Sequence, residues 1–535
     1  RNQIRDHHDS EHMERPTDMK LYYQDNGTLD YVEYLDNNGK ILFLKDYSPD
    51  MKVLTFKRAD EFGTELSLNA NTLKIFQNPM SDNASTKGQI SRYLLTYDNN
   101  GFVEKLEYAK YQNVKTGDLD GIYARIYERD SKGRVIKETY LGANGQIKET
   151  KKGLAIREHK FIENDDWVET SYFDRNHNAS KDETGVPVVR LYYDQYGNRI
   201  KEEYVNSNGE LVYRTDTKSA GFKYKYDENG FNIERRYFDV DGKDCIGSNG
   251  VAGITMQYNK NGDVIKYFNI DIDGNAAYDV ENGYFGYKAD YDENGNIIVL
   301  WFIDKNGEIA ECKNGHAGLT YKYDSIGNNT EIIYYDIDKK PMLTPDGVAG
   351  YRYIFNDMNL IKEVQCLNTD LKIALSENDG IAIWKNNYDE RGNRIGASFY
   401  NETGKELVLH QIDNYAGWAC KYDDNGNQIE YWKFDTDSAL TTANDNYAGY
   451  VSHYDEKGNE IERFFYDTKR NLVENSDGYA GWIAEYDERG NEILDKKIDV
   501  NKQPAKGWLV AKSKYDKNDN IIEYLLYDYK ENLAI

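Results

Sequence analysis

The sequence predicts an all-β protein built from tandem β-hairpin repeats of about 32 residues, stacked into an elongated, solenoid-like or superhelical sheet. The word Tyr-Asp-x-x-Gly-Asn, or a close variant, recurs at steps of 32 to 34 residues along most of the 535-residue chain. The residues before each word alternate between apolar and polar, which is typical of a half-buried strand. The composition agrees, because 48 Tyr favour strands and 43 Gly favour turns, while Pro is scarce at 7.

The repeat is read most simply from the tyrosine of each word. We expect these tyrosines to occupy one position in successive units and to form a buried structural ladder: Tyr193, Tyr226, Tyr258, Tyr291, Tyr323, Tyr388, Tyr422, Tyr454 and Tyr486. Phe355 fills the slot between Tyr323 and Tyr388, and Tyr97, Tyr127 and Tyr515 extend the series. One unit cannot bury its tyrosines alone, so stacked units must share a core.

Each word closes a hairpin. The Asp carboxylate is expected to accept a backbone N–H two residues further on, Gly supplies a positive φ, and the following Asn tolerates similar geometry. A second strand follows, as at 297–303, with apolar residues on both faces, which predicts cover on both sides. A second Asp-x-x-Gly turn and a short third strand then complete the unit.

An Ala-Gly pair leads into the first strand of several units. It recurs at Ala252-Gly253, Ala317-Gly318, Ala349-Gly350, Ala416-Gly417, Ala448-Gly449 and Ala480-Gly481. Small residues at a fixed slot predict a close backbone approach between successive units.

The predicted organisation has three parts. Residues 1–20 are expected to be a poorly ordered lead segment, residues 21–92 divergent N-terminal β repeats or a cap, and residues 93–535 the repeat array. The chain begins with Arg1 and not with Met, which we interpret as processing or truncation.

Charge and cysteine content exclude several classes of function. The formal net charge is −26, which disfavours nucleic acid and anionic membranes. No stretch of 18 apolar residues predicts a transmembrane helix. Cys245, Cys312, Cys366 and Cys420 lie far apart, so we expect isolated, mostly buried thiols and no metal cluster, with disulfides between repeats as the alternative.

The Tyr-Asp word before a Gly turn resembles the YD repeats of RHS-type bacterial proteins, over roughly residues 93–528. Such proteins are large and secreted or surface-associated, and their hairpins wind into a long β-sheet that can form a shell. The present chain departs from them in its longer period, its second turn and its Ala-Gly connector, and no RHS core or C-terminal toxin follows. The resemblance therefore implies a related repeat, not a toxin-bearing protein.

Two kinds of binding site are candidates. The words at Asp239, Asp241 and Asp244 and at Asp271 and Asp273 resemble the openings of Ca²⁺ loops but also satisfy turn chemistry. Trp301, Trp418, Trp432 and Trp482 either stack on sugar rings or belong to the core. Calcium is the one cofactor considered.

The sequence favours a noncatalytic extracellular or cell-surface scaffold or adhesin, because Asp and Glu occur everywhere and no catalytic pair is singled out. Its expected partners are a glycan, a protein, or itself in an oligomer or filament. The alternatives are the carbohydrate-binding region of a larger surface glycosyltransferase or hydrolase, and a structural shell that encloses a cargo.

Overall fold

A computed structural model describes residues 18–24, 29–35, 41–58, 90–110, 113–118, 120–162, 166–182, 184–325, 327–357, 360–390, 393–423, 427–456, 458–488, 490–516, 521–530 and 532–534. These residues form 33 β-strands that join in one sheet, and none of them lies in an α-helix. The predicted all-β fold is confirmed. The predicted lead segment, residues 1–20, lies largely outside the described residues.

The first four strands precede hairpins that already follow one another at steps of 32 residues, with first strands starting at residues 92, 124, 156 and 188. The strands of this part are β1 Asp18–Tyr23, β2 Leu29–Leu35, β3 Ile41–Tyr47, β4 Val53–Arg58, β5 Arg92–Tyr97, β6 Val103–Lys110, β7 Val114–Lys115, β8 Ala124–Arg129, β9 Val135–Leu141, β10 Ile156–Ile162, β11 Trp167–Phe173, β12 Val188–Tyr193 and β13 Arg199–Val205.

The same regular hairpin continues from β14 onward. The first strands are β14 Gly221–Tyr226, β16 Gly253–Tyr258, β18 Gly286–Tyr291, β20 Gly318–Tyr323, β22 Gly350–Phe355, β24 Ile383–Tyr388, β26 Gly417–Tyr422, β28 Gly449–Tyr454, β30 Gly481–Tyr486 and β32 Val510–Tyr515. The second strands are β15 Asn232–Phe238, β17 Val264–Ile270, β19 Ile297–Ile303, β21 Asn329–Tyr335, β23 Ile361–Leu367, β25 Arg394–Tyr400, β27 Gln428–Phe434, β29 Glu460–Tyr466, β31 Glu492–Ile498 and β33 Ile521–Tyr527.

The sheet is a continuous antiparallel meander. Each strand pairs with the strands before and after it in sequence, within hairpins as β14 with β15 and between units as β15 with β16. The short β7 is a side branch of β6, which pairs onward with β8. Among the described strands, β1 pairs only with β2 and β33 only with β32, so the sheet is not closed.

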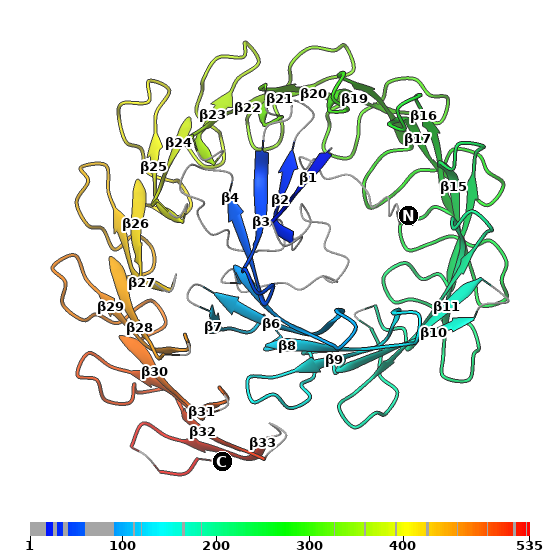
Figure 1. Cartoon of the computed structure of the whole chain (residues 1–535). Coiled ribbons are helices and arrows are strands. Elements are labelled where there is room, and N and C mark those ends of the chain that lie inside the picture. The colour runs from blue at the N-terminus through cyan, green and yellow to red at the C-terminus, as the bar shows by residue number, and fades with distance from the viewer. Residues whose placement is uncertain are drawn as a thin grey trace.

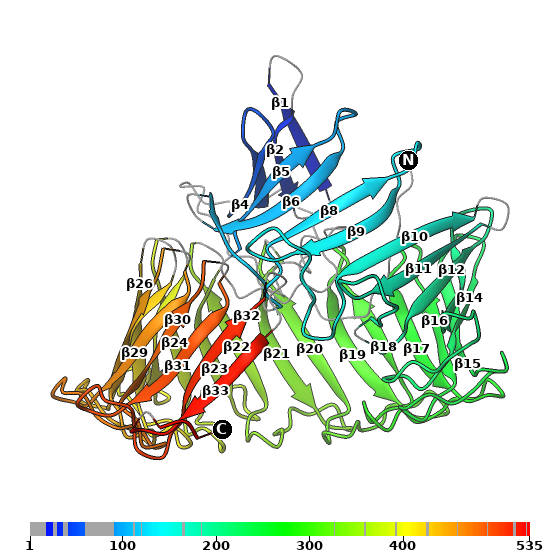
Figure 2. The same ribbon diagram turned by 90° about the horizontal axis from the view of Figure 1, so that it is seen from below.

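The meander coils into a ring. Seen along its axis, the wall from β10 to β33 curves through most of a circle, and β1–β4 lie within its outline (Figure 1). The view turned by 90° shows β1–β9 rising above one rim, while the long connectors between units gather at the other rim (Figure 2). Burial, and after it the charge of Asp455 in the turn after β28, raise the pKa of Tyr123, which precedes β8.

A β-bulge accompanies the tyrosine of the word. In the hairpin of β14 and β15 the register shifts between Lys225 and Tyr226, and the same shift recurs in the hairpins that follow. A bulge bends its strand and increases the local twist. The repeated bulge therefore gives each unit the same small bend, which agrees with the smooth curvature of the wall.

Two details of the predicted unit are wrong. The third strand is a single bridge residue, for example Asp244 opposite Phe238. The second strand is not covered on both sides, because six of the seven residues of β19 are only half-buried. A single-layer sheet leaves both faces partly open, and the connectors cover only part of one face.

The core is a chain of small clusters and not one large interior. One cluster joins Tyr204, Phe222 and Tyr237 of neighbouring strands to Val186 and Val251, which lie in connectors. Another joins Ala397 and Phe399 of β25 to Ile381 in the connector before β24. The largest cluster lies among β4–β9, so the start of the chain has the thickest packing.

Candidate functional site

The Asp of each word closes its turn as predicted. Asp227 Oδ1 accepts the backbone N–H groups of Asn229 and Phe231, both at 2.9 Å. Gly230 has a φ of 81°, which an L side chain rarely adopts. The aspartate is therefore committed to local hydrogen bonds.

The Asn that follows the Gly has a role that the sequence did not suggest. Its Nδ2 donates to the second carboxylate oxygen of the same Asp, as from Asn459 to Asp455 at 2.8 Å and from Asn296 to Asp292 at 3.0 Å. Neither asparagine has a positive φ, so the predicted reason for Asn at this position is wrong. The spacing of four residues from Asp to Asn was the available signal.

The tyrosine hydroxyl joins successive units. Tyr323 Oη donates to the carbonyl of Ile297, the first residue of the preceding second strand, at 3.0 Å. The equivalent bonds run from Tyr226 to Arg199, Tyr258 to Asn232, Tyr291 to Val264, Tyr388 to Ile361, Tyr454 to Gln428 and Tyr486 to Glu460. Tyr193 and Tyr422 end β12 and β26 at the same slot.

These tyrosines connect through the strand that lies between them. Equivalent residues are two strands apart, about 9.6 Å, which exceeds the range of a ring contact. Burial raises the pKa of Tyr291 and Tyr323 to about 12, so both hydroxyls stay protonated and able to donate at neutral pH. The ladder is thus a series of hydrogen bonds from unit to unit.

The Ala-Gly pair brings the backbones of two units together, as predicted. Ala252, Ala349 and Ala480 are fully buried. A Cβ added at Gly481 would lie 2.2 Å from the carbonyl oxygen of Arg463 in the preceding unit, and one at Gly253 would lie 2.2 Å from that of Arg235. At these two positions only glycine fits, whereas β24 and β32 hold Ile383 and Val510 in the equivalent slot.

The connectors are also joined to one another along the rim where they gather, opposite β1–β9, which is called the lower rim below (Figure 2). A single backbone hydrogen bond links each of several connectors to the previous one, for example Ser248 N–H to Thr217 O at 2.9 Å and Gln411 N–H to Asp379 O at 2.9 Å. Further bonds of this kind are Thr215 to Thr184, Val280 to Asn249, Glu377 to Asp346 and Ser476 to Asp445.

Four of the five aspartates proposed for calcium lie in turns, and Asp244 is the bridge residue opposite Phe238. Asp239 accepts the N–H groups of Asp241 and Lys243, and Asp271 accepts that of Asn275. Asp244 forms ion pairs with Lys223 at 2.9 Å and Arg236 at 3.5 Å, whereas Asp273 is exposed. Within the described part of the chain, no three His, Cys, Asp or Glu residues form a group suited to a metal ion.

The four tryptophans considered for glycan binding do not form one row. Trp418 and Lys433 are paired across strands, as are Ala419 and Trp432, so Trp418 and Trp432 point to opposite faces of the sheet. Trp432 is buried and the other three are half-buried.

A cation lies over each of these tryptophans. The pairs are Lys339 with Trp301 at 5.3 Å, Arg394 with Trp418 at 5.1 Å, Arg470 with Trp432 at 4.4 Å and Arg463 with Trp482 at 6.0 Å. Lys339 and Arg470 have positive φ values of 61° and 64° in the second turn, where other units carry glycine. The basic residues in this slot were the sequence signal for these contacts.

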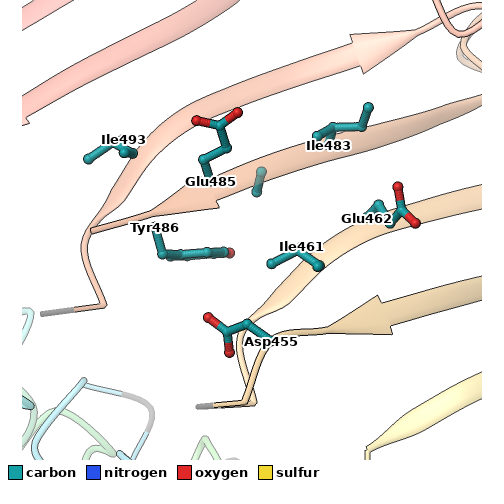
Figure 3. A pocket seen from close by; sticks show the side chains of 8 residues that line it. Asp455, Ile461, Glu462, Ile483, Glu485, Tyr486 and Ile493 are labelled. Carbon is teal, nitrogen blue, oxygen red and sulfur yellow. The ribbon is translucent and has the colours of Figure 1, made fainter. Parts of the chain in front are cut away.

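One shallow depression of about 440 Å³ lies between β29 and β30. It is lined by Asp455, Ile461, Glu462, Ile483, Ala484, Glu485, Tyr486 and Ile493. Its three carboxyl groups point in different directions (Figure 3), and Glu462 is paired with His453 at 2.9 Å. This surface offers negative charge and apolar contact without an enclosed reaction space.

The cysteines are free thiols, as expected, with Cys312, Cys366 and Cys420 buried and Cys245 partly buried. Among the described residues there is no helix of the length and hydropathy needed to span a bilayer.

Among the solved structures that resemble this chain are large TcdB2-TccC3 toxin assemblies. The TcdB2-TccC3-TEV structure has a TM-score of 0.30 at 13% identity, covering 96% of this chain and 23% of that chain. TcdB2-TccC3 without its hypervariable C-terminal region has a TM-score of 0.35 at 11% identity, covering 94% and 27%. This chain thus spans about a quarter of the length of these two chains.

A porin-like protein from Bacteroides uniformis has a TM-score of 0.14 at 9% identity, covering 63% of this chain and 92% of that chain. No family model and no curated protein matches. These values are too low to carry a function from one protein to another, so the fold rests on the strand pairing of the chain itself.

Proposed function

We propose that this chain is a noncatalytic structural repeat protein, a curved β wall that presents a long acidic surface to a polypeptide partner outside the cell or at a cell surface. The observation that supports the proposal best is the unbroken meander from β1 to β33, coiled into a ring (Figure 1). A surface that repeats at a fixed spacing suits extended partners.

The structural roles of the residues that recur along the repeats support the same proposal. The Asp and Asn of the word close turns, the Tyr hydroxyl joins units, and the Gly before the first strand lets two backbones meet. The residues that recur from unit to unit therefore stabilise the fold. What is left for recognition is the outer surface of the connectors and turns.

Glycan binding has less support than protein binding. Sugar rings stack on open aromatic faces, and the four candidate tryptophans each carry a cation over the ring. The net charge of −26 favours a basic polypeptide over an acidic polysaccharide or nucleic acid.

The shell remains a second candidate because β1–β4 lie within the outline of the ring (Figure 1). A shell needs the ring to be closed by further chain or further copies. Light scattering over a range of concentrations distinguishes the two ideas, since a scaffold stays an open ring and a shell forms a closed particle of fixed size.

The proposal is tested by solution X-ray scattering together with a glycan array and a panel of glycoside and ester substrates. We expect the scattering of an open ring, no turnover and no retained glycan. A glycan that binds wild type and is lost from a folded Trp418→Ala or Trp482→Ala variant would contradict the proposal. Turnover of any substrate would do the same.

A further inference from the structure

A row of exposed apolar side chains runs along the connectors at the lower rim. Each lies two residues beyond the bridge residue that follows a second strand, as Leu343 does after Pro341. The side chains are 40 to 53% exposed. This apolar row comprises Tyr213, Ile246, Tyr278, Leu343, Leu375 and Leu409.

The fold does not require apolar residues in this position. Equivalent positions in other units carry Glu149, Lys181, Glu311, Thr442, Glu474 and Lys506, and those units form the same hairpins and bridges. Glu311 interrupts the row in its middle. The repeats therefore act as an internal control, which shows that the hairpin and its bridge form without an apolar residue in this slot, although the Tyr278 ring also packs edge-on against Phe285 at 5.3 Å.

Single exposed apolar residues are normal on a protein surface, whereas apolar residues repeated at one position of neighbouring connectors offer a partner a regular series of contacts. Their spacing restricts the partner. Successive units are two strands apart, so the row has a period of about 9.6 Å. An extended β-strand covers this distance in about three residues. Side chains three residues apart in a strand point to opposite faces, so a strand could not direct one side chain toward each unit.

An α-helix also fits poorly, because about 9.6 Å corresponds to roughly 6.4 residues, which is not a whole number of turns. A polyproline II helix fits well. It has three residues per turn and rises about 3.1 Å per residue, so each third side chain returns to the same face every 9.3 Å or so.

Charge restricts the partner further. In the seven connectors that carry the row and Glu311, Asp and Glu outnumber Lys and Arg by more than two to one. A second copy of this acidic chain would be repelled there, whereas Lys and Arg between the apolar residues of a partner would be attracted.

We propose that the apolar row binds a basic polypeptide segment in the polyproline II conformation, with an apolar residue at every third position. This inference names the partner class of the proposed scaffold and rests on that function. Each unit receives one apolar side chain of the partner, and the acidic connectors receive the basic residues between them.

The probe is a synthetic, fluorescently labelled peptide of about 18 residues with the repeating triplet Pro-Lys-Leu, titrated against the full chain by fluorescence anisotropy. In this conformation it spans roughly 56 Å, close to the roughly 60 Å of the row. One control peptide has Glu in place of Lys, and another has the same composition in permuted order. We expect binding of the first peptide only.

The variants use residues that the same slot already holds. The double variant Leu343→Glu with Leu375→Thr is expected to weaken binding at least about tenfold, and Glu311→Leu, which fills the gap, to tighten it by about threefold or more. Glu474→Thr, outside the row, is the matched control and leaves binding unchanged. Far-ultraviolet circular dichroism checks that each variant is folded.

Three results would overturn the inference: no binding to wild type, equal binding of the permuted peptide, or equal affinity of the double variant. Self-association of wild type that the double variant loses would also overturn it, in favour of a second copy as the occupant. Failure of the peptide with ring-like scattering intact contradicts this inference alone, whereas glycan binding or turnover contradicts the proposed function.

Discussion

The tyrosine of the Tyr-Asp word contributes both a ring and a hydroxyl, and the two have separate uses. The ring is half-buried on one face of the sheet. The hydroxyl donates a hydrogen bond to a backbone carbonyl of the preceding unit, as Tyr323 does to Ile297. Phe355 occupies the same slot in β22 without a hydroxyl, so one missing bond is tolerated among many.

Replacing Tyr323 with Phe removes only this bond and leaves the Ile297 carbonyl without that donor. We expect a loss of about 1 kcal/mol in the local free energy of opening, measured by hydrogen exchange of the amides in β19 and β20. Tyr196→Phe is the control, because Tyr196 is 81% exposed. Equal stability of the two variants would show that the hydroxyl bond contributes nothing.

The turn aspartates predict how stability depends on pH. Backbone N–H groups hold the pKa of Asp271, Asp304 and Asp467 below the usual value. A carboxyl with a lowered folded pKa stabilises the fold above its unfolded pKa, and this contribution is lost as pH falls through the folded value. We therefore expect the thermal midpoint to fall as pH drops below about 4.

The variant Asp467→Asn keeps one acceptor oxygen but removes the titration. Its thermal midpoint should fall less steeply than that of wild type over the same acidic range. Asp118 has the opposite effect on stability, because burial raises its pKa to about 6 and the charged form is disfavoured in the folded state. The variant Asp118→Asn should therefore be more stable than wild type above that pH. A wild-type midpoint that does not change between pH 6 and 2 would contradict the assignment of the turns.

At the scale of the element, most first strands open with a glycine that lies against the preceding unit, whereas β24 and β32 open with Ile383 and Val510. A methyl group at Gly481 would collide with the carbonyl oxygen of Arg463, which is fixed by strand pairing. We expect Gly481→Ala to destabilise the interface of β29 and β30 by about 3 kcal/mol, measured by hydrogen exchange of the amides in β30. Gly490→Ala, with no atom near its added Cβ but a φ of 87°, should cost only about 1 kcal/mol.

In the second turn, one residue combines a strained backbone, which destabilises the fold, with a cation–π contact, which stabilises it. Arg470 has a left-handed backbone at a φ of 64° and lies 4.4 Å from the Trp432 ring. Arg470→Gly relieves the backbone but loses the cation, effects of about 1 kcal/mol each, so we expect a net change under about 1 kcal/mol. Arg470→Ala keeps the strain and loses the contact, and should be less stable than the Gly variant in urea denaturation monitored by tryptophan fluorescence.

Much of the hairpin followed from the sequence because its causes are local. Asp, Gly and the alternating strand residues act within a few positions, and these predictions are confirmed. The Tyr hydroxyl bond and the cation over Trp432 were missed because each joins residues from neighbouring units. The third strand was overestimated because the length of a pairing depends on how the connector returns across the sheet.

At the scale of the whole molecule, the ring results from the sum of small bends, one in each unit. Each unit adds one bulged hairpin with a similar bend, and no single residue encodes the final curvature. The sequence predicted a superhelical sheet but not its radius, because small angles per unit add over the whole array.

Contact between neighbouring units also predicts how the molecule unfolds. Units that touch only their neighbours open in groups, so the urea transition should be broader than that of one cooperative unit of 535 residues. The hydrogen-exchange effect of Gly481→Ala should stay within adjacent units. A single sharp transition seen by all probes would contradict this view.

The meander also sets the response of the chain to mechanical force. Because every strand pairs with its neighbours in sequence, tension applied to the two ends of the sheet would peel one hairpin at a time instead of shearing many bonds together. Each released repeat of 32 residues would add about 110 Å of contour length. In a single-molecule pulling experiment the protein would behave as an extensible tether, with a series of small, evenly spaced lengthening steps at low force.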